Sequence, residues 1–163
     1  MVEKLIGRKT SAVQKHFYAQ CDCGQEILEF AVVQYAVCLP IPEYPEVHIY
    51  FHGQSRHPKS RYQSFGFGKG QFARFVGNWV TTIPEEEPLV FEDSSEGGGY
   101  LVLRNEGYGY FSLSRYSNKK KMDKQDSNWD FILREEEFIE INKALEDLYK
   151  FYEDMEMKYD EES

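Results

Sequence analysis

The chain of 163 residues has no run of about 18 apolar residues, the length that a membrane-spanning helix requires. Its first residues also lack a basic segment followed by about 7–15 apolar residues, the pattern of a secretory leader. We therefore expect a protein that does not contact membranes and is located in the cytoplasm.

Cysteine is scarce, since the chain has only Cys21, Cys23 and Cys38. An odd number of cysteines makes a poor disulfide framework, so reduced thiols are favoured. A zinc site built from these three residues and one histidine is an alternative, although zinc motifs usually space paired cysteines about two to four residues apart. A simple hairpin turn, with Gly24 at a positive φ, explains the motif equally well. We favour the turn and expect no bound metal and no other cofactor.

A catalytic set is also missing from the sequence. Ser112 and Ser114 have no evident histidine and aspartate partners, and paired carboxylates occur only in runs expected to be exposed. The loop from Gly66 to Gly70 resembles a phosphate-binding loop but lacks the Lys-Ser/Thr ending of a P-loop. We therefore expect a protein that is not an enzyme.

Aromatic residues, in contrast, are abundant: 12 Phe, 12 Tyr and 2 Trp make up 16% of the chain. Such side chains suit the half-buried surface of a pleated sheet. The length is that of one domain with a substantial core. We expect an α+β fold with a mainly antiparallel sheet, a short mid-chain helix and a long C-terminal amphipathic helix. The predicted domain covers residues 1–159, with a flexible loop at 94–99 and a frayed acidic tail at 160–163.

The periodicity of apolar residues places the individual elements. Phe72, Phe75, Val76 and Trp79 have helical spacing and predict a short helix over residues 70–80. A three-residue turn at 105–107 is expected between two hairpin strands, and the lysine run 119–121 is expected in a polar loop. Strands are predicted over residues 16–20, 27–33, 47–52, 62–67, 89–91, 100–104, 108–115 and 129–133.

The end of the chain predicts the clearest element. From Phe138 to Tyr159, apolar residues recur at spacings of three and four, which indicates a long amphipathic helix. Residues 131–163 hold 12 acidic and 4 basic residues, so this segment carries −8 of the net charge of −9. We expect the apolar stripe to pack on the chain's own sheet, with a coiled-coil dimer as the alternative. The candidate partner-binding residues of this helix are Glu136, Glu140, Asp147, Glu153 and Asp154.

A second asymmetry lies in the middle of the chain. No acidic residue occurs between Glu46 and Glu85, and basic and aromatic residues alternate there. Surfaces for single-stranded nucleic acid combine cations for the phosphates with exposed rings for the bases. The alternative is that most of these rings belong to the core, because half of the side chains on a strand point inward. The candidate nucleic-acid-binding residues are Arg56, Lys59, Arg61, Phe65, Phe67, Lys69 and Arg74.

Two resemblances can be attached to these residues. Residues 17–28, with the motif Cys21-Asp22-Cys23-Gly24, and the strand-to-helix segment 131–137 resemble small uncharacterised phage and prophage proteins. The run of strands before a terminal helix is similar in outline to PC4-like and Whirly-like single-strand binders, which is a likeness of fold rather than of function. The first resemblance implies a small viral accessory protein that binds host machinery or nucleic acid.

Two functional hypotheses follow. The leading one is a non-enzymatic binding protein of phage type that contacts single-stranded nucleic acid through the basic and aromatic stretch. The alternative is an inhibitor or regulator of a host protein that acts through the acidic C-terminal helix.

Overall fold

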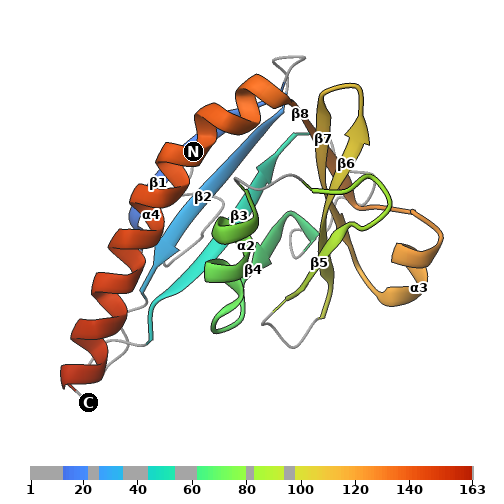
Figure 1. The fold of residues 1–163 in the computed structure, drawn as a ribbon. Helices are drawn as coiled ribbons and strands as arrows, with labels where there is room; N and C mark the ends of the chain where they lie inside the picture. The colour runs from blue at the N-terminus through green and yellow to red at the C-terminus, as the bar shows by residue number, and fades with distance from the viewer. Residues whose placement is uncertain are drawn as a thin grey trace.

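The computed structural model describes residues 13–21, 26–34, 44–53, 62–79, 83–93 and 98–162. Within these ranges, two antiparallel sheets of four strands each follow one another along the chain (Figure 1). The first sheet has the order β1 (Val13–Gln20), β2 (Ile27–Val33), β3 (Glu46–His52) and β4 (Ser64–Gly66). The second has the order β5 (Leu89–Glu92), β6 (Tyr100–Gly107), β7 (Tyr110–Tyr116) and β8 (Trp129–Arg134). The helices are α2 (Gln71–Trp79), α3 (Lys119–Asp123) and α4 (Glu135–Glu162).

The predicted fold class is therefore confirmed. The structure is α+β, with antiparallel sheets, a short mid-chain helix and a long C-terminal helix. The order of four strands followed by a helix occurs twice, first as β1–β4 with α2 and then as β5–β8 with α4, with α3 inserted before β8. No helix of the described residues combines the length and the apolar composition needed to cross a bilayer.

Two local predictions are wrong. The lysine run lies in α3 rather than in a loop, because the Asn118 side chain caps this helix by accepting a hydrogen bond from the Lys121 backbone N–H at 2.8 Å. The second error concerns the hairpin between β6 and β7. Of the tail 160–163, residues 160–162 belong to α4, and its fraying stays a prediction.

The β6–β7 hairpin turns later than expected, because the first strand ends three residues later and the second begins two residues later than the sequence predicts. β6 continues through Gly107, and the chain reverses at Tyr108 and Gly109, whose φ angles are 56° and 78°. Two consecutive positive φ values are the signature of a tight type I′ hairpin turn. A bulge between Asn105 and Gly107 shifts the register, and the Gly107 N–H donates to the Asn105 side chain at 2.9 Å. Of the predicted flexible loop 94–99, residues 94–97 lie outside the described residues.

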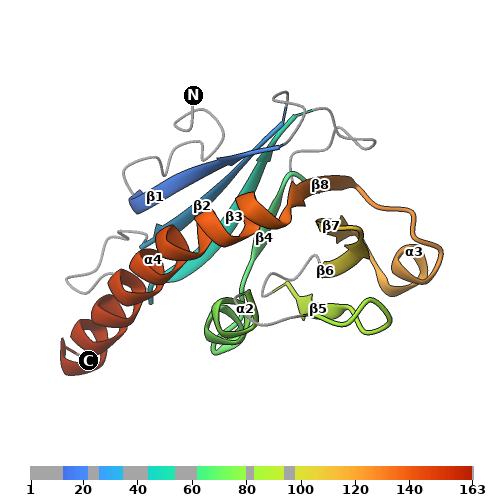
Figure 2. The ribbon, with the colours of Figure 1, turned by 45° about the horizontal axis from the view of Figure 1, so that its top comes forward.

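The core lies between the sheets and the two longer helices. Figures 1 and 2 show α4 crossing the first sheet, with α2 beside it and toward the second sheet. All four residues of the predicted α2 stripe are buried. On α4 the buried residues are Phe138, Leu145, Leu148 and Tyr152, and they belong to one cluster with residues of both sheets. The prediction that the C-terminal helix packs on its own sheet is confirmed.

A buried arginine joins the two sheets. Arg115 of β7 is only 3% exposed. Its Nε donates to the Ser64 carbonyl in β4 at 2.8 Å, and its Nη1 donates to the Asn128 side chain at 2.8 Å. Its Nη2 lies 3.6 Å from the buried carboxylate of Asp93, which follows β5. Asp93 also forms a backbone bridge with Phe67 at the end of β4, so polar contacts link the sheets where their edges meet.

We expect the substitution Arg115→Ala to lower the free energy of unfolding by about 3–5 kcal/mol, because it leaves a buried carboxylate without its cation. Urea denaturation followed by tryptophan fluorescence measures this change. The matched control is Arg134→Ala at an exposed position, for which we expect a change within about 0.5 kcal/mol. Equal effects of the two substitutions would show that the buried contacts of Arg115 do not stabilise the fold.

We expect the chain truncated after Leu133 to lose cooperative folding. Removing four large buried side chains of α4 costs about 1.5–3 kcal/mol each, which together approaches the whole stability of a typical domain, about 5–15 kcal/mol. Circular dichroism during thermal melting detects the loss. A truncated chain that still melts cooperatively would show that α4 is an appendage rather than part of the core.

Candidate functional site

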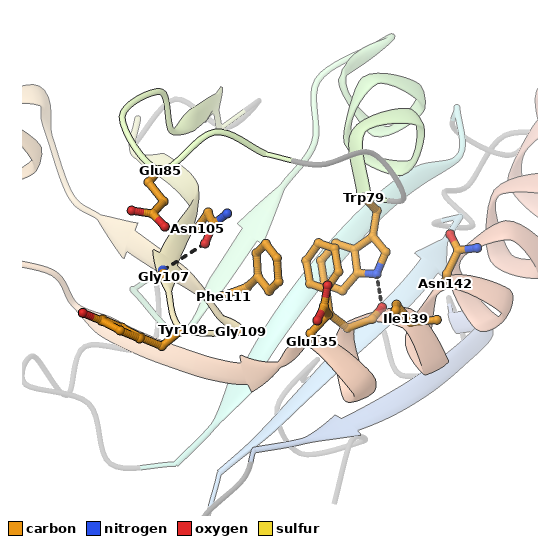
Figure 3. A pocket seen from close by; sticks show the side chains of 11 residues that line it. Trp79, Glu85, Asn105, Gly107, Tyr108, Gly109, Phe111, Glu135, Ile139 and Asn142 are labelled. Atoms are coloured by element: carbon orange, nitrogen blue, oxygen red, sulfur yellow. Dashed lines mark hydrogen bonds between the residues drawn. The ribbon is translucent and has the colours of Figure 1, made fainter.

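One candidate site is a cleft of about 420 Å³ beside the first turns of α4 (Figure 3). One wall is the N-terminal part of α4, another is the tip of the β6–β7 hairpin, and the end of α2 closes the third side. The lining residues are Trp79, Glu85, Asn105, Gly107, Tyr108, Gly109, Phe111, Glu135, Phe138, Ile139 and Asn142.

The floor of this cleft is a stack of three aromatic rings. Phe138 lies between the other two, with ring centroids 4.1 Å from Trp79 and 4.3 Å from Phe111. The Trp79 indole N–H donates to the Phe138 carbonyl at 2.6 Å, and Figure 3 shows this bond at the base of the cleft. Because Trp79 is fully buried, the floor is a fixed part of the core.

Apolar side chains on two sides of the cleft are open to solvent. Tyr108 at the hairpin tip is 101% exposed, and Ile139 on the first turns of α4 is 64% exposed. Gly107 allows the Glu85 carboxylate to approach the turn, since a Cβ at this position would lie 3.2 Å from Glu85 Oε1. Large exposed apolar side chains beside a cleft are typical of a surface that meets another molecule.

The rim of the cleft is acidic. Glu85 and Glu135 are both exposed carboxylates, and the described residues of the lining include no lysine or arginine. Asn142 also lines the cleft, and its Nδ2 donates to Glu146 at 3.1 Å. Its Oδ1 is buried and has no hydrogen-bond partner among the described residues. The cleft thus offers acceptors over an aromatic floor.

A second candidate surface lies on the face of the first sheet that points away from the core. We call it the ring face, and it consists of His16, Tyr18, His48 and His52 around the buried Glu29. His16 Nδ1 lies 2.7 Å from Glu29 Oε2, and His52 Nε2 lies 3.1 Å from Glu29 Oε1. The single carboxylate therefore orients two imidazoles on different strands.

The other rings extend this surface across the sheet. Tyr18 is 51% exposed, and its ring centroid lies 5.1 Å from that of His16 and 6.3 Å from that of His52. His48 stacks on Tyr50 at 5.9 Å and contacts Glu46 at 2.8 Å. Burial, and to a lesser extent the charge of Glu29, raises the pKa of the Tyr18 hydroxyl.

The structure corrects part of the predicted nucleic-acid site. Phe65 and Phe67 are 0% and 4% exposed, so the prediction that they are stacking rings is wrong. Their strand turns them toward α2 and the second sheet, where Phe67 packs against Phe75 and Phe91. The predicted cations Arg56, Lys59 and Arg61 lie outside the described residues.

The remaining two predicted cations are exposed and lie apart from the ring face's centre. Arg74 donates to the Val90 carbonyl at 2.9 Å and lies 4.5 Å from the Phe91 ring centroid. Lys69 Nζ lies 5.3 Å from the Tyr44 ring centroid and lines a depression of about 450 Å³ together with His48. Lys69 is thus the cation that adjoins one end of the ring face.

The depression near Lys69 also contains the contact between α4 and the segment before β3. The Tyr44 hydroxyl donates to the Glu156 carboxylate, and the Tyr152 hydroxyl donates to the same carboxylate at 3.0 Å. Burial and then the interaction with Glu156 raise the pKa of Tyr44 to about 12. Burial, followed by the charge of Glu156, also raises the pKa of Tyr152. An acidic residue of α4 therefore lies near the start of the acid-free stretch, with Tyr44 between it and Lys69.

The five predicted partner-binding residues of α4 are all exposed. Lysines at 143, 150 and 158 share the outer side of the helix with them, so most of this side is mixed in charge. The first turn is different, because it holds Glu135, Glu136 and Glu137 without a lysine. Of the predicted residues, Glu136 lies closest to the cleft, in a shallow depression that also includes Tyr108.

The cysteine prediction is corrected at one position. Cys21 is buried and disulfide-bonded, whereas the sequence favoured reduced thiols. Cys23, Gly24 and Cys38 lie outside the described residues, which leaves the proposed turn untested. The part of the chain that the structure describes has no group of three or more histidine, cysteine or acidic residues able to hold a metal ion.

Comparison with known proteins gives no relative. No protein-family model matches the chain, and no curated protein or solved structure matches it either.

Sequence reasoning missed the cleft. Its described lining comes from four separate segments, and only the Gly107-Tyr108-Gly109 tripeptide gave a signal in the sequence. A tyrosine between two glycines at a hairpin tip has no neighbouring side chain to cover it. The ring face was missed because its residues come from three strands, β1, β2 and β3, whose register the sequence does not give.

Proposed function

We propose that the chain is a binding protein without enzymatic activity, and that its partner is a protein bound at the cleft and the acidic first turn of α4. The observation that carries the proposal is the cleft itself: an aromatic floor, two exposed apolar side chains and an acidic rim in one place. Protein interfaces commonly combine a central apolar anchor site with a polar rim. This proposal corresponds to the second of the two hypotheses drawn from the sequence.

The position of the cleft restricts which part of α4 would contact the partner. Glu136 and Glu140, which lie in the first turns, would flank a partner seated at the cleft. Asp147, Glu153 and Asp154 lie farther along the helix, where lysines accompany them, and would contribute less to partner binding.

Three expectations stay predictions of the sequence: a host protein as the partner, a phage origin and dimerisation through α4. A cytoplasmic location also stays a prediction, and the disulfide at Cys21 weighs against it because disulfides rarely persist in reducing compartments.

Site-specific photo-crosslinking tests this proposal. A photoreactive phenylalanine at position 108 should give covalent adducts with one protein in cells of the native source, because Tyr108 projects beside the cleft. The matched control carries the same group at Lys120, an exposed residue of α3, and should give none. Equal adducts at both positions, or none at position 108, would exclude a protein partner at the cleft.

Contact with single-stranded nucleic acid is the second candidate function, and the ring face is what favours it. Of the rings on this face of the sheet, His16 and Tyr18 are exposed, and exposed rings are suited to stacking on bases, because every base has a face on which to stack. Tyr18, the most exposed ring, replaces the buried Phe65 and Phe67 in this version. The resemblance to PC4-like and Whirly-like binders is based on a run of strands before a terminal helix. Among the described residues, four strands followed by a helix occur twice.

Fluorescence anisotropy with a labelled oligothymidine, at about 50 and 200 mM salt, measures this activity. If the ring face binds, Tyr18→Ala should weaken affinity roughly five- to hundredfold, since each stacked base contributes about 1–3 kcal/mol. Tyr110→Ala removes a partly exposed tyrosine from the other sheet and should leave binding unchanged. No binding at either salt concentration, or binding without salt dependence, would remove the nucleic-acid function.

A further inference from the structure

We infer that the cleft recognises a guanidinium group, which a protein partner would supply as an arginine side chain. The inference rests on the proposed function, because it names the chemistry of the partner at the same site. It follows from which hydrogen-bonding groups in the cleft are already occupied and which are left.

The side-chain donors of the cleft are partly occupied. The Trp79 indole N–H donates to the Phe138 carbonyl at 2.6 Å. One N–H of the Asn105 amide donates to the Ile83 carbonyl at 2.7 Å, and one N–H of the Asn142 amide donates to Glu146 at 3.1 Å. Among the described lining side chains, the second N–H of each amide and the Tyr108 hydroxyl are left as donors. All of them are neutral, and an anionic ligand such as a carboxylate or phosphate would meet them beside two carboxylates whose charge repels it.

The acceptors, in contrast, are open. The carboxylates of Glu85 and Glu135 line the cleft from different elements, Glu85 beside the hairpin at Gly107 and Glu135 in the first turn of α4 (Figure 3). The Asn142 Oδ1 also lacks a hydrogen-bond partner among the described residues, but it is buried, so a ligand would reach it only after this side chain turns toward the cleft. In Figure 3 this oxygen is turned to the side of Trp79, while the amide nitrogen is turned away. The site is thus complementary to a group with several donors and a positive charge.

Arginine fits this arrangement better than lysine. A guanidinium has five N–H donors in a plane and can bond a carboxylate with two of them, whereas an ammonium is a compact point charge. The planar group can also lie over an aromatic ring, and the freely exposed Tyr108 ring stands beside the cleft. The methylene stem of the side chain would contact Ile139 and the edge of the aromatic floor.

The charge around the cleft also favours a positively charged ligand. Glu136 adds a third carboxylate in the adjoining depression and would attract a cation during approach. Arg134 lines that depression, not the cleft, so the described chain does not fill the site with its own guanidinium. The cleft is therefore an acceptor site without a cation of its own.

The test uses N-acetyl-arginine amide as a probe of the full-length, ¹⁵N-labelled chain. We expect concentration-dependent shifts of the Trp79 indole N–H and of the Gly107 and Gly109 amides in NMR spectra. A dissociation constant on the order of a millimolar is reasonable for so small a ligand. The neutral isostere N-acetyl-citrulline amide should bind at least tenfold more weakly. Equal binding of the two probes would overturn the inference.

Matched variants locate the probe. Glu85→Gln and Glu135→Gln keep the shape of the side chains and should each weaken binding of the arginine probe about three- to tenfold. Asp123→Asn removes an equal charge from an exposed site in α3 and should have no effect. An equal loss in all three variants would mean that the probe senses only net charge, which overturns a specific site.

The outcome is separable from that of the proposed function. If the arginine probe does not bind while position 108 still crosslinks to a protein, the guanidinium inference fails and the protein-binding function stands. If the probe binds through Glu85 and Glu135 but position 108 crosslinks to nothing, the site recognises guanidinium groups and the proposed protein partner fails.

Discussion

The arrangement of the two sheets depends on the burial of one positive charge. A guanidinium removed from water must have acceptors on all its sides, and Arg115 obtains them from β4, from the residue after β5, from Gly98 and from the segment before β8. Those acceptors belong to both sheets, so each sheet completes the environment of the charge only when the other is in place. The aromatic core surrounds this contact, with Trp129 stacked on Phe51 at 4.7 Å across the two sheets. Burial of rings supplies the driving force, and the arginine fixes how the sheets meet.

Most of the fold could be predicted because local patterns and the final packing agree. The stripe of Phe72, Phe75, Val76 and Trp79 has helical spacing, and the helix buries that stripe. The errors fall where a single hydrogen bond or a positive φ decides the structure, as in the capping of α3 by Asn118 and the reversal at Tyr108. Such details depend on side-chain contacts that periodicity does not record.

The candidate sites were harder to predict because they depend on which side of a strand faces inward. Aromatic residues of the middle stretch divide between the core and the ring face, and the sequence cannot assign a ring to one side without the register. The choice went wrong for Phe65 and Phe67, while Tyr18 on another strand was overlooked. The cleft was beyond prediction for a different reason, since its walls come from α2, a loop, the hairpin and α4.

The shared walls of the cleft have a thermodynamic consequence. Trp79 comes from the first group of four strands and a helix, whereas Tyr108, Glu135 and Ile139 come from the second. A molecule seated in the cleft touches both groups and binds only the state in which they are docked. By mass action, it raises the melting temperature by an amount that grows with the logarithm of the ligand concentration once the site is nearly saturated, and any mutation that loosens the docking weakens binding without touching the cleft. The affinity for a ligand in the cleft and the stability of the fold therefore both depend on the equilibrium between the docked and undocked states of the two groups.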